Sequence, residues 1–81
     1  MHYAYTLKSN LNPNRYHVGH TNNLKRRLSE HNSGQSTYTS HYNPWIIINY
    51  FVFYSKLKAS AFEIYLKSHA GRKFQKKHFA D

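Results

Sequence analysis

The stretch that decides the fold is Tyr16–His31, which reads YHVGHTNNLKRRLSEH. It begins as an alternating, strand-like segment, breaks at Gly19 and continues into a basic helix. It combines a candidate proton acceptor, a glycine that permits close backbone approach, a helix N-terminus and two arginines, which together suit the binding of a phosphate. We therefore interpret this stretch as half of an active site, whose other half must include a carboxylate.

The composition predicts a small, basic domain. The 81 residues contain twelve Lys and Arg but three Asp and Glu, which gives a net charge of +9. A chain of this length forms one domain, here residues 1–81, and its charge favours nucleic acid over a membrane surface. Because the sequence has no cysteine, no signal-like apolar segment and no transmembrane stretch, we expect a cytoplasmic protein with neither disulfides nor a thiolate zinc site.

Two strands are predicted before the basic helix of this stretch. Alternation predicts them at His2–Lys8 and Arg15–His20, and the turn-forming residues SNLNPN between them favour an antiparallel hairpin. Within the second strand, alternation turns His17 and Gly19 to one face and Tyr16 to the other.

The helix that follows is predicted over Asn22–Ser33. Thr21 or Asn22 can cap its N-terminus, and Gly34 can supply a left-handed stop. Two leucines four residues apart form its apolar stripe.

Basic side chains flank that stripe. Arg27 and His31 are also four residues apart and are expected on the rim of the packed face, while Lys25 and Arg26 point to solvent.

The C-terminal half predicts one strand and two helices. Gln35–Pro44 is polar and is interpreted as a mobile loop at the mouth of a site. The apolar run Trp45–Tyr54 predicts a strand in the middle of the sheet, covered on both faces. A helix is predicted over Lys56–Ser68 with the preceding serine as its cap, and Gly71 is expected to separate it from a short basic helix over Arg72–Ala80.

Few residues can supply the carboxylate, because the only acidic ones are Glu30, Glu63 and Asp81. Asp81 is the chain end and is expected to fray. Glu30 lies opposite the packed stripe of its helix, where a solvated ion pair with Arg26 or Arg27 is expected.

Glu63 differs because it lies between Phe62 and Ile64, close to apolar positions of its helix. A carboxylate at the edge of a core is costly unless it binds or pairs with a cation. Either a metal ion or Lys67, four residues further on, satisfies that requirement, and the pattern leaves both open.

Five segments in this order and spacing resemble the small single-domain GIY-YIG nucleases. Residues 3–5, YAY, and residues 17–19, HVG, stand where the two tripeptides of that family belong. The helix LKRRLSEHNSG, the Pro44-Trp45 pair and the segment AFEIYLKSHAGRKF follow, and GHTNNL, residues 19–24, is close to the bacterial members.

The resemblance implies an α+β fold with a three-stranded antiparallel sheet flanked by about three helices. It implies hydrolysis of a phosphodiester with one divalent ion, Mg²⁺ or Mn²⁺, bound by Glu63. Tyr5 then orients the nucleophile or the phosphate, Arg27 stabilises the charge that grows on the phosphate, and His31 helps to hold or protonate it.

The second tripeptide departs from the family pattern. The family uses a tyrosine as the base that deprotonates water, and His17 stands at that position here. An imidazole, with an ordinary pKa of about 6.5, is well matched to this role near neutral pH. Tyr16 is the alternative, but alternation turns it to the wrong face. Tyr3 also replaces the leading glycine of the first tripeptide.

We expect the substrate to be DNA, with RNA left open, cut with selectivity for structure or weak selectivity for sequence, as in the repair and homing relatives. A targeting protein or a homodimer would supply further selection. The residues expected to contact nucleic acid are Lys8, Gly19, His20, Lys25, Arg26, Arg72 and Lys73.

Two other interpretations compete with the nuclease. The first is a nucleic-acid-binding protein whose site no longer cleaves, which the histidine in the second tripeptide favours. The second is a histidine zinc site. His17 and His20 are three apart on a strand and face opposite sides, so they are poorly placed to chelate one ion.

Overall fold

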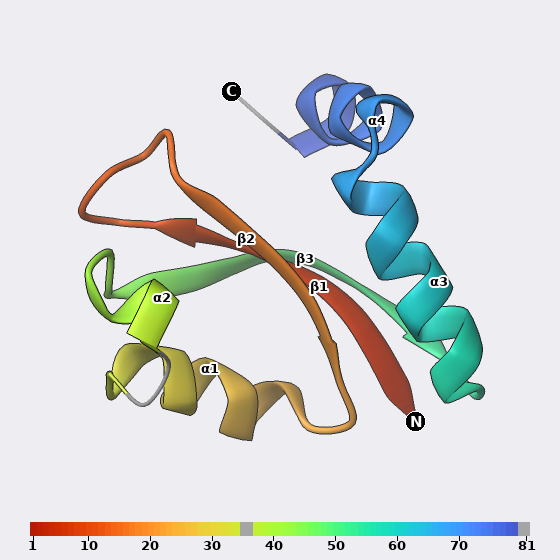
Figure 1. Ribbon diagram of the computed structural model, residues 1–81, viewed down its shortest axis with the longest axis horizontal. Helices are drawn as coiled ribbons and strands as arrows, with labels where there is room; N and C mark the ends of the chain where they lie inside the picture. The colour runs from red at the N-terminus through yellow and green to blue at the C-terminus, as the bar shows by residue number, and fades with distance from the viewer. Residues whose placement is uncertain (35–36, 80–81) are drawn as a thin grey trace.

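The first strand, β1 (His2–Ser9), lies at the centre of a three-stranded antiparallel sheet of order β2-β1-β3 (Figure 1). The computed structural model describes residues 1–34 and 37–79. β2 (Tyr16–Thr21) pairs with one edge of β1, and β3 (Trp45–Phe53) pairs with the other. The hairpin and the three-stranded antiparallel sheet expected from the sequence are both confirmed.

The predicted central position of the third strand is wrong, because β3 is an edge strand. The uncharged, β-branched and aromatic run suggested burial on both faces, yet Trp45 and Asn49 are buried while Ile46 and Tyr50 are exposed. The central position belongs to β1, in which Ala4–Leu7 are buried without interruption. Apolar composition reports how well a side chain fits a pleated surface, and it does not report the order of strands.

Helices cover both faces of the sheet (Figure 1). α1 (Leu24–Asn32) and the short α2 (Thr37–Ser40) lie on one face, and α3 (Lys56–Lys67) and α4 (His69–Phe79) lie on the other. On the α1 face, a core of strand residues packs against both leucines of the helix; its buried members are Tyr5, Leu7 and Trp45. On the α3 face, the apolar contacts are mostly aromatic; they include Phe51, Phe62 and Phe74.

The helix ends agree in part with the sequence. Asn23 caps α1 by accepting a hydrogen bond from the backbone N–H of Arg26, so the predicted caps, Thr21 and Asn22, are wrong. The Thr21 hydroxyl accepts instead from the backbone N–H of Asn23. The left-handed stop at Gly34, with φ of 81°, is confirmed. The serine cap of α3 is confirmed as well.

The boundary between α3 and α4 lies at Ser68, and the prediction that Gly71 separates the two helices is wrong. Gly71 is buried inside α4, where an added Cβ would lie 1.9 Å from the carbonyl oxygen of Tyr65. The glycine is therefore needed for close packing of α4 against the end of α3.

The predicted loop before β3 contains α2. Gln35 and Ser36 of that loop lie outside the described residues, as do Ala80 and Asp81 at the end of the chain. Asn32 connects α1 to β3, because its side-chain amide donates to the carbonyl oxygen of Trp45 and accepts from the backbone N–H of the same residue. The indole N–H of Trp45 also donates to the carbonyl oxygen of Thr39, which joins α2 to this face of the sheet.

Candidate active site

Tyr5 and Gly19 lie opposite each other in the pairing of β1 with β2. The Tyr5 ring is only 2% exposed, and an added Cβ at position 19 would lie 2.6 Å from its hydroxyl oxygen and 2.8 Å from Cζ. Only glycine leaves room for the ring to lie against β2 in this way. Gly19 was expected to approach the substrate; its contact in the structure is with Tyr5.

A buried hydrogen-bond chain extends from Tyr5. Its hydroxyl lies 3.2 Å from Nε2 of His31, and Nδ1 of His31 lies 2.8 Å from Oγ1 of Thr39. His31 is 0% exposed, so the predicted position on the rim of α1 is wrong. The reason is helical spacing, because His31 is three residues beyond Leu28 and therefore belongs to the packed stripe itself.

The protonation states in this chain follow from burial. Burial lowers the pKa of His31 to about 4, with further lowering from nearby His17 and Arg27. Burial also raises the pKa of Tyr5, against the opposing effect of Arg27, so the phenol keeps its proton at neutral pH. Arg27 donates a hydrogen bond to the Tyr5 oxygen, so we assign the phenol O–H as the donor to Nε2 of His31 and Nδ1–H of His31 as the donor to Thr39.

Arg27 connects this buried chain to the surface. Hydrogen bonding to Tyr5, followed by hydrogen bonding to Glu30, raises the pKa of its guanidinium, and Nη1 lies 3.0 Å from Oε1 of Glu30. The predicted ion pairing of Glu30 on α1 is thereby confirmed. The Arg27 side chain remains 38% exposed. A fixed, solvent-accessible guanidinium is well suited to bind a phosphate.

His17 lies on the same face of the sheet as Tyr5, as alternation predicts. Its ring centroid is 4.7 Å from that of His31 and 6.3 Å from that of Tyr5. Burial lowers its pKa, and the cations Lys67 and Arg27 lower it further against the opposing effect of Glu63. The imidazole is therefore neutral at neutral pH and able to accept a proton.

Glu63 on α3 holds two basic side chains. Its carboxylate forms hydrogen bonds with Nδ1 of His20 and with Nζ of Lys67, which confirms the ion pair suggested by the sequence spacing. Burial raises the pKa of Glu63, but the two hydrogen bonds outweigh this effect and leave the pKa below its usual value. The carboxylate is therefore ionised, and it acts electrostatically on both Tyr5 and His17.

The donor set fits a hard divalent ion that is shared with substrate. Among residues 1–34 and 37–79, no three His, Asp or Glu side chains gather as a metal-binding group. Mg²⁺ is commonly bound by one or two carboxylates together with water and substrate phosphate oxygens, so the single ionised carboxylate of Glu63 meets this requirement. His20 and Lys67 each engage one of its oxygens, so a bound ion would use a remaining lone pair of the carboxylate or displace one of these two partners.

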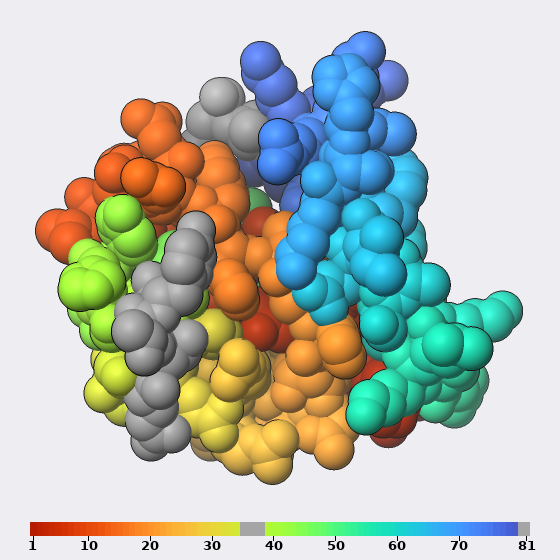
Figure 2. All heavy atoms as spheres, viewed as in Figure 1, coloured from red at the N-terminus to blue at the C-terminus, as the bar shows by residue number. Residues whose placement is uncertain are grey.

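The basic residues expected at the interface lie on several elements. Lys25 and Arg26 are exposed on α1, Lys73 is exposed on α4 and Lys8 is partly buried on β1. Arg72 lines a cavity beside His17. Figure 2 shows a hollow between the atoms of β2, α1 and the C-terminal helices, with atoms of β1 visible inside it.

Sequence reasoning missed two parts of this site. Thr39 forms a hydrogen bond with Nδ1 of His31, but it lies in a polar stretch that carries no periodic signal. His20 was expected to contact nucleic acid, and its partner is Glu63, which is 43 residues away in the chain. Such a pairing depends on how α3 crosses the sheet, which local pattern does not report.

The fold and site define a small α+β domain in which an Arg27 guanidinium, a His17 imidazole of lowered pKa and an ionised Glu63 carboxylate act electrostatically on one another or on Tyr5. The chain belongs to the GIY-YIG catalytic domain family, whose model matches residues 1–78. The family is a nuclease family, and its members generally use divalent metal ions.

A solved structure supports this assignment. The solution NMR structure of the UPF0213 protein BH0048 from Bacillus halodurans is 28% identical in sequence, with a TM-score of 0.54, over 94% of this chain and 80% of that one. No curated protein matches the chain. Within the part of the chain that the structure describes, no helix has the length and apolar character needed to cross a bilayer.

Proposed function

We propose that this chain is a metal-dependent endonuclease that hydrolyses phosphodiester bonds of DNA. One observation carries the proposal: Arg27 and Glu63 lie close enough to affect the pKa of both His17 and the buried Tyr5. Family membership supports a nuclease, and the net charge of +9 supports a nucleic-acid substrate.

The proposed roles follow the exposure of each group. Neutral His17 accepts a proton from the attacking water, and Arg27 donates hydrogen bonds to the phosphate oxygens as their charge grows. Tyr5 and His31 are too deeply buried to touch the phosphate, so they act as positioning residues for Arg27. Glu63 holds Mg²⁺ or Mn²⁺, which supplies positive charge to the phosphate and the leaving oxygen.

We propose that the enzyme selects its DNA substrate mainly by the structure of the DNA and only weakly by its base sequence. Basic residues contact phosphates, which are common to every DNA sequence. Selection by sequence would then require a targeting protein or a homodimer. Cytoplasmic DNA transactions such as repair are the proposed setting.

A cleavage assay tests this proposal. Purified protein is incubated with nicked, branched and single-stranded DNA in Mg²⁺, in Mn²⁺ or in EDTA. We expect metal-dependent cleavage that Glu63→Gln and Arg27→Ala lower by at least about 100-fold. Lys58→Ala, which removes one exposed charge from α3, serves as the control for nonspecific loss of charge. Wild-type activity in Glu63→Gln would refute the assigned metal ligand.

The pH dependence tests His17 separately. Because its pKa lies below 6.5, the cleavage rate should stay level through neutral pH and fall as pH drops below that pKa, where the imidazole becomes protonated. His17→Tyr restores the family residue and should replace this profile by a rate that rises toward alkaline pH. An unchanged profile in His17→Tyr would exclude His17 as the base.

A non-cleaving DNA-binding protein is the second candidate. The observation that favours it is the engagement of both Glu63 oxygens by His20 and Lys67, which gives the carboxylate a structural role as an ion-pair partner. Tight, salt-dependent DNA binding with no cleavage of any substrate in Mg²⁺ or Mn²⁺ would establish this candidate instead.

A further inference from the structure

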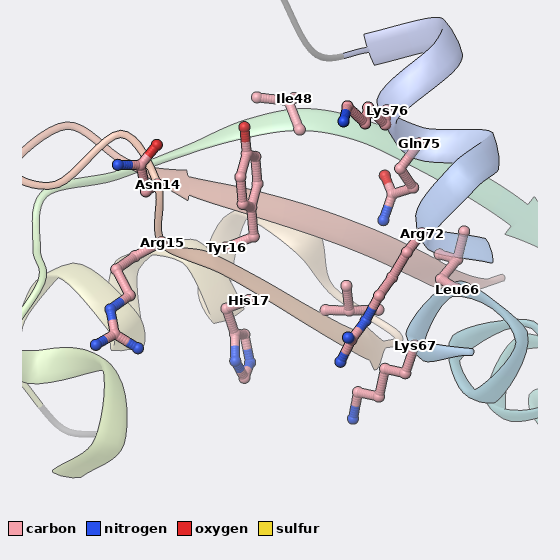
Figure 3. Close-up of a pocket in the computed structure, with 11 residues that line it drawn as sticks. Asn14, Arg15, Tyr16, His17, Ile48, Leu66, Lys67, Arg72, Gln75 and Lys76 are labelled. Atoms are coloured by element: carbon pink, nitrogen blue, oxygen red, sulfur yellow. The ribbon is translucent and has the colours of Figure 1, made fainter. Parts of the chain in front are cut away.

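A cavity of about 850 Å³ opens beside His17, between β2 and the C-terminal helices. β2 forms one wall with Tyr16, His17 and Val18. The C-terminal end of α3 and the middle of α4 form the opposite wall (Figure 3). Its volume lies within the range of roughly 300–1,000 Å³ that is typical of ligand sites. The cavity therefore extends the candidate active site along β2.

Three of the residues that line this cavity are aliphatic. Val18 and Leu66 come from β2 and α3, and Ile48 comes from β3. Tyr16 adds an aromatic ring whose residue is 43% exposed, so the ring is available to a ligand. An apolar surface with an accessible aromatic ring is suited to stack against the flat face of a nucleobase.

The remaining lining residues are positively charged or polar, and none is acidic. The cations are Arg15, Lys67, Arg72 and Lys76. Figure 3 shows that Arg72 and Lys67 direct their charged ends to the same end of the cavity as the His17 ring. If one phosphate of a DNA strand is bound near His17, these cations can bind the neighbouring phosphates of the same strand.

Gln75 adds a fixed donor to the cavity wall. Its Oε1 accepts hydrogen bonds from Oγ1 of Thr6 at 3.1 Å and from Nδ2 of Asn49 at 2.7 Å. These two bonds hold the amide through its oxygen, which leaves Nε2 as a donor on a residue that lines the cavity. An oriented N–H₂ in a cavity that also has aliphatic lining residues matches the hydrogen-bond acceptors on a base edge.

We propose that this cavity binds an unpaired DNA strand next to the phosphate that is cleaved. Bases in a duplex are stacked and paired, so only an unpaired base can enter a cavity of this size and lie against Tyr16. The cations of the rim bind the phosphates of the same strand. The inference rests on the proposed function, because it places the cleaved phosphate at His17, and it names the substrate as DNA with a single-stranded portion.

DNA binding without cleavage tests the cavity. Fluorescence anisotropy in EDTA compares an oligothymidine of about twelve nucleotides, within the site sizes of such grooves, with a blunt duplex of similar length. Arg72→Ala/Lys76→Ala removes two charges from the cavity, and Lys73→Ala/Lys77→Ala removes two from the same helix outside the cavity lining. The first pair should weaken single-strand binding about tenfold more than duplex binding, whereas the second should weaken both equally.

A second pair of variants tests the proposed stacking of a base on Tyr16. Tyr16→Ala should lower single-strand affinity by roughly fivefold or more, the usual size of one lost stacking contact. Tyr54→Ala removes a more exposed tyrosine that does not line the cavity and should have no selective effect. If both double variants lower the two affinities alike, or if Tyr16→Ala binds the single strand normally, the inference is overturned.

The two proposals fail separately. Loss of the single-strand preference alongside retained metal-dependent cleavage would overturn the cavity inference and leave the nuclease intact. A cavity-dependent single-strand preference without cleavage on any substrate would support the cavity and overturn the nuclease.

Discussion

Gly19→Ala tests whether close packing between β1 and β2 holds the site together. The added methyl group would lie 2.6 Å from Oη and 2.8 Å from Cζ of Tyr5, both far inside ordinary van der Waals contact. The ring has little freedom to withdraw, since it is buried and its hydroxyl is bonded to His31. Overpacking of this kind costs about 1–3 kcal/mol.

The cost should appear as a lower melting temperature, by roughly 4–8 °C for each kcal/mol in a domain of this size. Cleavage should fall further than the loss of folded protein explains, because displacement of the Tyr5 hydroxyl also releases Arg27. Thermal unfolding and cleavage rates are measured for Gly19→Ala alone and in a Tyr5→Phe background. Removal of the hydroxyl relieves the closest contact, so the alanine should cost less in that background.

Two results would refute this reasoning. One is a Gly19→Ala protein as stable as the parent, which would mean that the ring moves freely. The other is an equal cost of Gly19→Ala with and without the Tyr5 hydroxyl, which would place the strain elsewhere.

Three further predictions concern stability and positioning. His31, with a pKa of about 4 in the folded state and about 6.5 when unfolded, contributes about 3 kcal/mol of stability that is complete above pH 6.5 and is lost as pH falls toward 4. The pH dependence of urea unfolding should therefore flatten in His31→Gln and persist in His41→Gln, a change at an exposed position. Gly71→Ala should destabilise more than Gly19→Ala in the same melting assay, because its methyl group would meet backbone atoms of α3 rather than a side chain. Glu30→Gln should change the free energy of unfolding by less than about 1 kcal/mol, because its ion pairs are partly exposed, and should still slow cleavage by loosening Arg27; an unchanged rate would show that Glu30 does not position Arg27.

Local pattern predicted the elements of this fold well and their arrangement less well. Alternation placed His17 and Gly19 on one face, and the register with β1 brings them to Tyr5 and Leu7 as a consequence. The order of strands in the sheet cannot be predicted from alternation in the same way. It depends on how all the strands and helices pack together. The uncharged and largely apolar run of β3 suggested a central strand, whereas the central strand is β1, which contacts α1 on one face and α3 on the other.

The helical period predicts which residues are buried when it is applied to every residue of a helix. His31 follows Leu28 by three residues, so it shares the buried stripe, and placing it by its four-residue spacing from Arg27 led to the wrong expectation of a rim position. The close packing of Gly71 could not be predicted from the neighbouring sequence, because the atoms that it contacts belong to the end of another helix, α3. The distant pairing of His20 with Glu63 likewise arises only when α3 lies across β2.

The position of His17 explains how an imidazole can stand where the family uses a phenol. Burial and the nearby cations Lys67 and Arg27 keep the ring neutral before substrate arrives, so it need not lose a proton first. A bound phosphate brings negative charge to the same cations and thereby reverses part of their effect on the pKa of the ring. The imidazole would then become more basic when a water molecule must be deprotonated. In the proposed mechanism the two cations keep His17 neutral before binding, and the phosphate that they bind makes it a stronger base, whereas a phenol would first have to lose its own proton.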